Sequence, residues 1–270
     1  MRVFNLHKIF LSPFFEKLNI SSLNGLLWLL LMLVPFIFLQ RALHREIQAV
    51  FLILTRRTNI TMVLFSLLFF PGVFIHELSH FLMAKLLFVP TGSVSLIPKT
   101  MPDGRLRLGY VEVSKSDILR DSIIGMAPLI AGGLFISYAA IYPLNLLPLW
   151  GAFQQANFSK FWAGLLALPS LPDFSLWFYL TFTVSSTMLP SESDRNAWMS
   201  LGGTIILLVA IAAFAGAGTW MLETLAPLLN IFFRSVATIF GLSAAVHGFL
   251  VLPLLLIHKI LTRISGLDLG

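Results

Sequence analysis

The sequence contains no cysteine, and this absence limits both how the chain is held together and what it can bind. Without thiols there are no disulfides, and no thiolate can serve as a metal ligand. Any metal ion bound by this chain must therefore be held by nitrogen and oxygen donors.

Charged residues are also scarce. They make up 11% of the 270 residues, whereas hydrophobic residues make up 57% and the mean hydropathy is +0.89. Few polar stretches could cover a water-facing surface, so the composition predicts an integral membrane protein. The formal net charge of +6 does not indicate a nucleic-acid partner, because the Lys and Arg residues form no basic block with interleaved aromatics.

The first 22 residues lack a clear small-residue cleavage site, so we do not interpret them as a cleaved signal peptide. Lys8 and Lys17 stand among Phe and Leu residues, which is typical of an amphipathic segment on a membrane surface. We therefore expect an amphipathic N-terminal segment at 1–22 and one membrane-embedded domain at 23–270, with its core at about 61–200.

Apolar runs predict an all-α polytopic membrane protein with about six transmembrane helices. The expected spans are approximately 23–39, 61–89, 122–147, 176–189, 201–222 and 236–256. A small β-hairpin is expected after the second span, because two short alternating runs, 92–98 and 105–113, flank Asp103 and Gly104. The third span contains the small-residue string GMAPLIAGG, 125–133, which permits close helix approach.

The distribution of basic residues predicts the orientation. If the N-terminus is cytosolic, most of the 18 Lys and Arg residues fall on the cytosolic side of the six expected spans. This bias predicts that both chain ends face the cytosol, together with the polar ends of the second and fourth spans. We therefore expect a multi-pass protein of the cell membrane with its site toward the cytosol.

The sequence HELSH, residues 76–80, places two histidines and a glutamate inside the second span, where charged groups are costly. His76 and His80 are four residues apart and lie on one helical face, so two neutral imidazoles can bind the same ion. Glu77 lies close enough to take a proton from water at that ion. Catalytic zinc usually has three protein ligands and an open position, so the chain must supply a third donor.

Asp194 is the first candidate for this third ligand, because it follows another apolar helix at the same predicted depth as the histidine pair. Glu192 lies two residues away and is a close competitor. Glu223 lies at the far end of the fifth expected span and Glu112 lies on the hairpin, so each is placed less directly beside the histidine pair. The lone His247 in the sixth span is more typical of a hydrogen-bonded core histidine. Asp194 could instead be an ordinary helix cap, because SESD precedes a helix start.

Three segments together resemble the site-2 protease family of intramembrane zinc metalloproteases. HELSHFLMAKLLFVPTGSVSLIP, 76–98, is similar to the family's metal-binding helix and to the strand that lines its substrate cleft. MAPLIAGGLFI, 126–136, resembles the family's Gly-Pro segment on the next span. SSTMLPSESD, 185–194, resembles the helix that carries the third ligand, with Ser186 where the family usually has Asn.

The resemblance implies that the domain at 23–270 is a metalloprotease. Its Zn²⁺ ligands would be His76, His80 and Asp194. Glu77 would be the catalytic base, which takes a proton from water and later delivers it to the leaving amine. The expected partners are the lipid bilayer and a transmembrane protein substrate, whose helix must unwind because helical hydrogen bonds hide its carbonyls.

Two other classes of protein stay open at this point. A zinc transporter also places His and Glu in spanning helices, but it needs polar donors along a path through the bilayer, and the far halves of these spans contain almost none. A non-proteolytic zinc-binding membrane protein is not excluded by anything in the sequence. The sequence also leaves the oligomeric state open.

Overall fold

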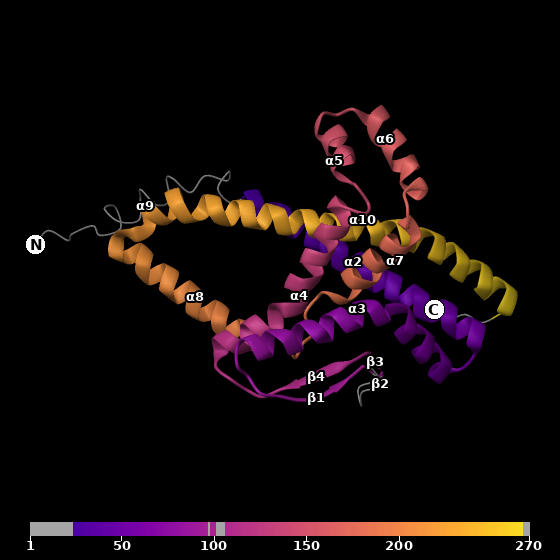
Figure 1. Ribbon diagram of the computed structural model, residues 1–270, viewed down its shortest axis with the longest axis horizontal. Coiled ribbons are helices and arrows are strands. Elements are labelled where there is room, and N and C mark those ends of the chain that lie inside the picture. The colour runs from indigo at the N-terminus through magenta and orange to yellow at the C-terminus, as the bar shows by residue number, and fades with distance from the viewer. Residues whose placement is uncertain (1–23, 97, 101–105, 267–270) are drawn as a thin grey trace, which may run out of the picture.

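The computed structural model describes residues 24–96, 98–100 and 106–266. The chain is mostly helical, with a small antiparallel sheet beside its second long helix (Figure 1). Two predictions from the sequence, the amphipathic segment at 1–22 and the turn at Asp103 and Gly104, lie outside the described residues.

Long helices form most of the structure, as the apolar composition predicts. In chain order the α-helices are α2 (Asn24–Thr55), α3 (Thr58–Leu86), α4 (Ile118–Ile141), α5 (Leu147–Gln154), α6 (Phe158–Ala167), α7 (Phe174–Thr187), α8 (Trp198–Ala212), α9 (Gly218–Trp220) and α10 (Ala226–Ser265). A 3-10 turn at Leu168–Ser170 precedes α7, and π-helical turns at Ala213–Ala217 and Met221–Leu225 flank α9.

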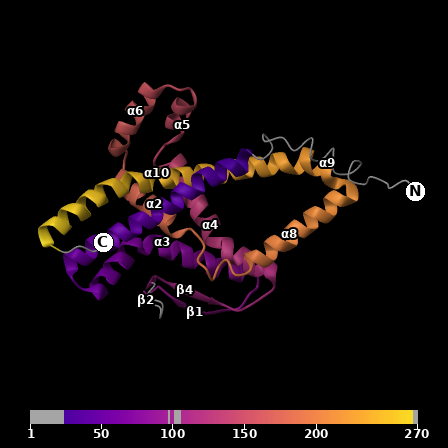
Figure 2. The same cartoon turned by 180° about the vertical axis from the view of Figure 1, so that it is seen from behind.

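The strands form two short antiparallel ladders between α3 and α4. The ladders join β1 (Thr91–Ser95) to β4 (Tyr110–Val113), and β2 (Lys99–Thr100) to β3 (Leu106–Arg107). The β1–β4 pair lies along α3, on the side of the bundle opposite α5 and α6 (Figures 1 and 2). The small antiparallel sheet is thus present, and it contacts the helix that carries HELSH.

The helices α2 and α10 lie side by side and run in the same direction (Figures 1 and 2). Near the start of α2, the backbone N–H of Gly25 donates to the side chain of Asn230. Near its end, Glu46 accepts a hydrogen bond from His258. From the first contact to the second, the residue number increases along both helices, so the two helices are parallel. The start of α2 therefore lies at the opposite end of the bundle from the end of α10.

The helices α3, α4 and α7 pack together at the centre. Tyr179 on α7 donates to the carbonyl of Leu68 on α3 over 2.9 Å. One turn further along α3, Gly72 lies so close to α7 that a Cβ there would be 2.2 Å from the carbonyl oxygen of Thr183. Gly132 also brings α4 close to the end of α7, because a Cβ there would be 2.5 Å from Cβ of Met188, the residue after this helix. Small residues thus permit the close helix packing on which association within a membrane depends.

Four helical stretches are long and apolar enough to cross a membrane, and α6 with α7 would form a fifth, bent span. These helices are compatible with a multi-pass membrane protein, but the predicted count of six spans is not confirmed. The last two predicted spans fall within one helical stretch, Trp198–Ser265, which turns at Gly216 with a φ of 95°. Glycine allows this turn because it has no Cβ to clash in the left-handed conformation.

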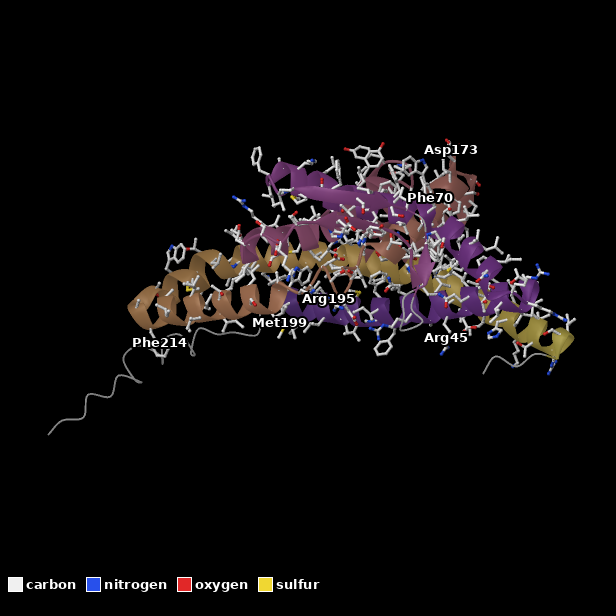
Figure 3. The ribbon with its side chains drawn as sticks, turned by 90° about the horizontal axis from the view of Figure 1, so that it is seen from below. Arg45, Phe70, Asp173, Arg195, Met199 and Phe214 are labelled. Atoms are coloured by element: carbon white, nitrogen blue, oxygen red, sulfur yellow. The ribbon has the colours of Figure 1, made fainter. Side chains whose placement is uncertain are left out.

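The turn at Gly216 makes a hairpin of α8 and the start of α10, which extends beyond the other helices (Figure 3). Met199 lies where α8 leaves the bundle, and Phe214 lies near the tip of the hairpin. Both arms carry exposed apolar side chains, such as Ile206 and Ile231. Such a surface is suited to contact with lipid.

The parallel course of α2 and α10 bears on membrane topology. If both helices span the bilayer, the chain crosses it an odd number of times from the start of α2 to the end of α10. An odd number is compatible with five spans, in which α6 and α7 together form one bent span. The six-span prediction instead places both ends on one side of the membrane, because hydropathy identifies spans without giving their direction.

The absence of cysteine allows a direct test of this topology. Ser116, just before α4, and Ser265, the last residue of α10, would each be replaced by Cys and labelled in sealed vesicles with a membrane-impermeant maleimide. We expect the two positions to be labelled from opposite sides, because the start of α4 and the end of α10 lie at opposite ends of the bundle (Figure 1). Permeabilised vesicles, in which both positions are labelled, provide the control. Labelling of both from one side would contradict the odd number of crossings.

Candidate metal centre

Three side chains from two parts of the chain converge at one point. They are His76 and His80 on α3, and Asp194 in the turn between α7 and α8. The two Nε2 atoms lie 3.2 Å apart. Asp194 Oδ1 is 3.3 Å from His80 Nε2, and Oδ2 is 3.6 Å from His76 Nε2. Arg195, the residue after Asp194, marks this turn near the middle of Figure 3.

Backbone carbonyls fix the tautomer of both histidines. His76 Nδ1 is 2.6 Å from the oxygen of Thr187, the last residue of α7, and His80 Nδ1 is 2.9 Å from the oxygen of Ile124 on α4. A carbonyl oxygen can only accept, so each Nδ1 carries a hydrogen and donates it. In the neutral imidazoles both Nε2 atoms then present lone pairs to each other and to the carboxylate.

This arrangement needs a positive charge at its centre. Two nitrogen lone pairs and a carboxylate repel one another, and the largely buried setting provides little water to screen them. Burial also opposes the ionisation of Asp194, but contacts with His76 and His80 outweigh it and hold the pKa of that carboxyl below its usual range. A cation at this point, either a metal ion or a proton, would relieve the repulsion.

The separations between the donor atoms fit a metal ion. In tetrahedral coordination with bonds of about 2.0 to 2.1 Å, neighbouring donor atoms lie about 3.3 Å apart. The three separations here, 3.2, 3.3 and 3.6 Å, all lie near that value. A proton shared between two atoms would account for one of these contacts, whereas one ion accounts for all three.

The turn that carries Asp194 is shaped by its own sequence. Pro190 disfavours helix at the residue before it, so α7 ends at Thr187 and the chain is free to turn. Within the turn, the backbone N–H of Ser191 donates to Asp194 Oδ2 over 2.7 Å. This bond orients the carboxylate, as hydrogen bonds to metal-binding carboxylates commonly do.

The helix α4 contacts two of the three converging residues at consecutive positions. Ile124 accepts the hydrogen bond from His80. Its neighbour Gly125 lies directly against the turn, so that a Cβ there would be 2.0 Å from the carbonyl oxygen of Asp194. The string GMAPLIAGG predicts close packing of this span, but only the structure shows that Gly125 packs against the turn that carries Asp194.

Glu77 lies beside the three converging residues rather than among them. Successive residues on a helix point about 100° apart, so Glu77 faces a different side of α3 from His76. Glu77 is buried and borders an apolar cleft of about 200 Å³. The other lining residues are Phe74, Leu78, Phe81, Val94 and Leu96. Gly109, before β4, lies close to Glu77, since a Cβ there would be 3.1 Å from Glu77 Cγ. The absence of a side chain at Gly109 thus allows the sheet to lie against this part of α3.

The other residues considered for the third ligand lie elsewhere. Glu192 is in the same turn as Asp194 but is exposed, Glu112 is on β4, and Glu223 is in the π-helical turn before α10. None of them belongs to the converging group among the described residues. His247 is fully buried with both ring nitrogens hydrogen-bonded, as expected of a core histidine.

Comparisons with known proteins do not place the chain in a family. No family model matches it, and neither a curated protein nor a solved structure does. Its function must be argued from the residues of the site.

The first test of the site compares Asp194→Ala with Glu192→Ala, a matched change two residues away. We expect Asp194→Ala to weaken metal retention at least tenfold, because it removes one of three donors, and Glu192→Ala to leave it unchanged. The measurement is metal per chain after dialysis against a mild chelator. The His76→Ala/His80→Ala double variant should lose the metal completely. Loss confined to Glu192→Ala would overturn the assignment of Asp194.

The second test compares two glycines on α4. Gly125→Ala should displace the Asp194 turn and reduce metal retention about tenfold, because the added Cβ meets backbone atoms that cannot move aside independently. Gly133→Ala is the control, since its Cβ would make only an ordinary 3.5 Å contact with Ile239. The same dialysis measurement applies. Equal retention in both variants would show that close approach at Gly125 does not position Asp194.

Proposed function

We propose that the protein is an intramembrane zinc metalloprotease that hydrolyses a peptide bond in or near the transmembrane segment of another membrane protein. One observation carries the proposal: on a single long apolar helix, two histidines that converge with Asp194 adjoin a buried glutamate that borders an apolar cleft. A purely structural metal site would not need this glutamate or this cleft.

Zinc suits the donor set. Two imidazole nitrogens and one carboxylate oxygen are donors that zinc prefers, whereas magnesium and calcium favour sites made of oxygen alone. Three protein ligands also leave one position for water or substrate, which is typical of catalytic rather than structural zinc. When bound, zinc lowers the pKa of water to about 7 and polarises a carbonyl.

Glu77 would act as the catalytic base. It follows His76 directly, so it lies beside the metal-binding face, and it borders the cleft in which the substrate would lie. In this role its carboxylate accepts a proton from the attacking water and delivers it to the leaving amine.

The β1 strand would hold the substrate. Within the described residues, β1 pairs with β4 along one edge and no strand pairs with its other edge. Val94 in β1 and Leu96 just beyond it border the cleft. A substrate must be extended for its carbonyl to be attacked, and an extended segment can add to a free strand edge. An apolar side chain of that segment would enter the cleft of about 200 Å³.

We further propose that the chain crosses the cell membrane five times, with the metal centre toward the cytosolic end. Support comes from the parallel course of α2 and α10 and from the basic residues near the strands, including Lys85, Lys115 and Arg120.

A zinc transporter is the main alternative. It would require several metal-binding positions along a path through the bilayer, whereas the described residues contain one converging group of His, Asp or Glu. Zinc flux into sealed vesicles that contain the purified protein would favour this alternative. Zinc binding without either flux or proteolysis would favour a non-proteolytic metal-binding protein.

The test of the proposed function is Glu77→Gln. We expect this variant to keep its zinc and its fold but to cleave at least 100-fold more slowly, because the amide cannot accept the proton. Cleavage of a panel of transmembrane-helix reporter proteins would be followed in liposomes, beside zinc content and thermal unfolding. Glu192→Gln, in the exposed part of the Asp194 turn, is the control. Undiminished cleavage by Glu77→Gln would remove Glu77 as the base.

A further inference from the structure

The end of α7 has a hydrogen-bonding requirement that bears on the metal centre. The last four carbonyls of a helix have no N–H partner within that helix, and apolar surroundings provide no water to replace one. In α7 two of these carbonyls, those of Ser186 and Thr187, accept from side chains of other helices. Gln40 Nε2 on α2 donates to Ser186 over 2.5 Å, and His76 Nδ1 on α3 is 2.6 Å from Thr187.

Ser186 is also held through its side chain. Its hydroxyl lies 2.9 Å from His247 Nε2 on α10, and His247 Nδ1 lies 2.8 Å from the carbonyl oxygen of Ser243. Because that carbonyl can only accept, Nδ1 carries the hydrogen, and Nε2 accepts from the Ser186 hydroxyl. One residue of α7 is thus fixed at two points, by α2 through its carbonyl and by α10 through its hydroxyl.

Burial and ring contacts hold the His247 side chain in this hydrogen-bonded orientation. Its side chain is fully buried, with the ring of Phe36 at 5.3 Å and that of Phe182 at 5.7 Å. Ser186 is 2% exposed, so both partners of this bond are shielded from solvent. A buried polar pair that is fully hydrogen-bonded specifies one packing arrangement, because any shift would leave a buried polar atom without a partner.

We propose that Gln40 and His247 are positioning residues for the metal centre and act through Ser186. Ser186 immediately precedes Thr187, whose carbonyl orients His76, and the same chain segment continues into the turn that carries Asp194. Fixing Ser186 therefore fixes the direction of one imidazole and the starting point of the turn. The metal centre extends in this way to α2 and α10, outside the segment, about 61–200, in which the sequence places its core.

This inference rests on the proposed metal centre, so its test measures metal binding rather than activity. Purified wild type and the variants Gln40→Leu and Ser186→Ala would be loaded with Co²⁺. We expect about tenfold weaker Co²⁺ retention against a chelator in each variant, with a changed visible absorption spectrum, because the spectrum reports the ligand geometry. Thermal unfolding of the metal-free proteins would be recorded in parallel.

Tyr179→Phe is the matched control. It also removes a hydrogen bond from a side chain to a helix carbonyl between two packed helices, but two turns before the end of α7. It should lower the unfolding temperature as much as the other variants while leaving Co²⁺ retention and the spectrum as in the wild type. If Tyr179→Phe changed the spectrum equally, a general packing effect would replace the inference.

The remaining outcomes separate the two proposals. Wild type that binds no Co²⁺ would overturn the metal centre itself. Wild type that binds Co²⁺, with Gln40→Leu and Ser186→Ala identical to it in retention and spectrum, would overturn the positioning role and leave the metal centre in place.

Discussion

The structure around the candidate site depends on one electrostatic constraint, the approach of two imidazole lone pairs and a carboxylate within a largely buried space. The Nε2 atoms of His76 and His80 lie 3.2 Å apart, with Asp194 beside them. These donors repel one another unless a cation lies between them. The protein holds them there by using their other atoms, since each Nδ1 donates to a backbone carbonyl and the carboxylate accepts from a backbone N–H.

The carbonyl partners of the histidines have a common physical origin in close helix packing. The carbonyl of Thr187 is free because α7 ends there, and His76 reaches it because Gly72 lets α3 approach α7 one turn earlier. Gly125 likewise lets α4 approach the turn that carries Asp194. In an apolar environment these contacts replace hydrogen bonds to water. The packing of the helices therefore also determines the orientation of the candidate ligands.

The proposed chemistry uses the rotation of the α-helix to separate two tasks. His76 and His80 share one face of α3 and converge on the candidate ion. Glu77 follows His76 by about 100° and borders the apolar cleft beside β1. Gly109 allows the sheet to lie against α3 at this residue. The candidate ligands, the proposed base and the strand edge proposed to hold the substrate thus lie close together around one helix.

The sequence by itself determined the features that depend on local spacing and composition: a membrane-type helical chain, the shared face of His76 and His80, and the position of Glu77 between them. It also indicated Asp194 over Glu192, although from chain position alone. Only the tertiary structure decided that Gln40 reaches Ser186, 146 residues away, that Gly125 is the glycine against Asp194, and that α2 and α10 run parallel. Helical periodicity fixes which residues share a face, but contacts between distant helices depend on how whole helices pack, which no local pattern encodes.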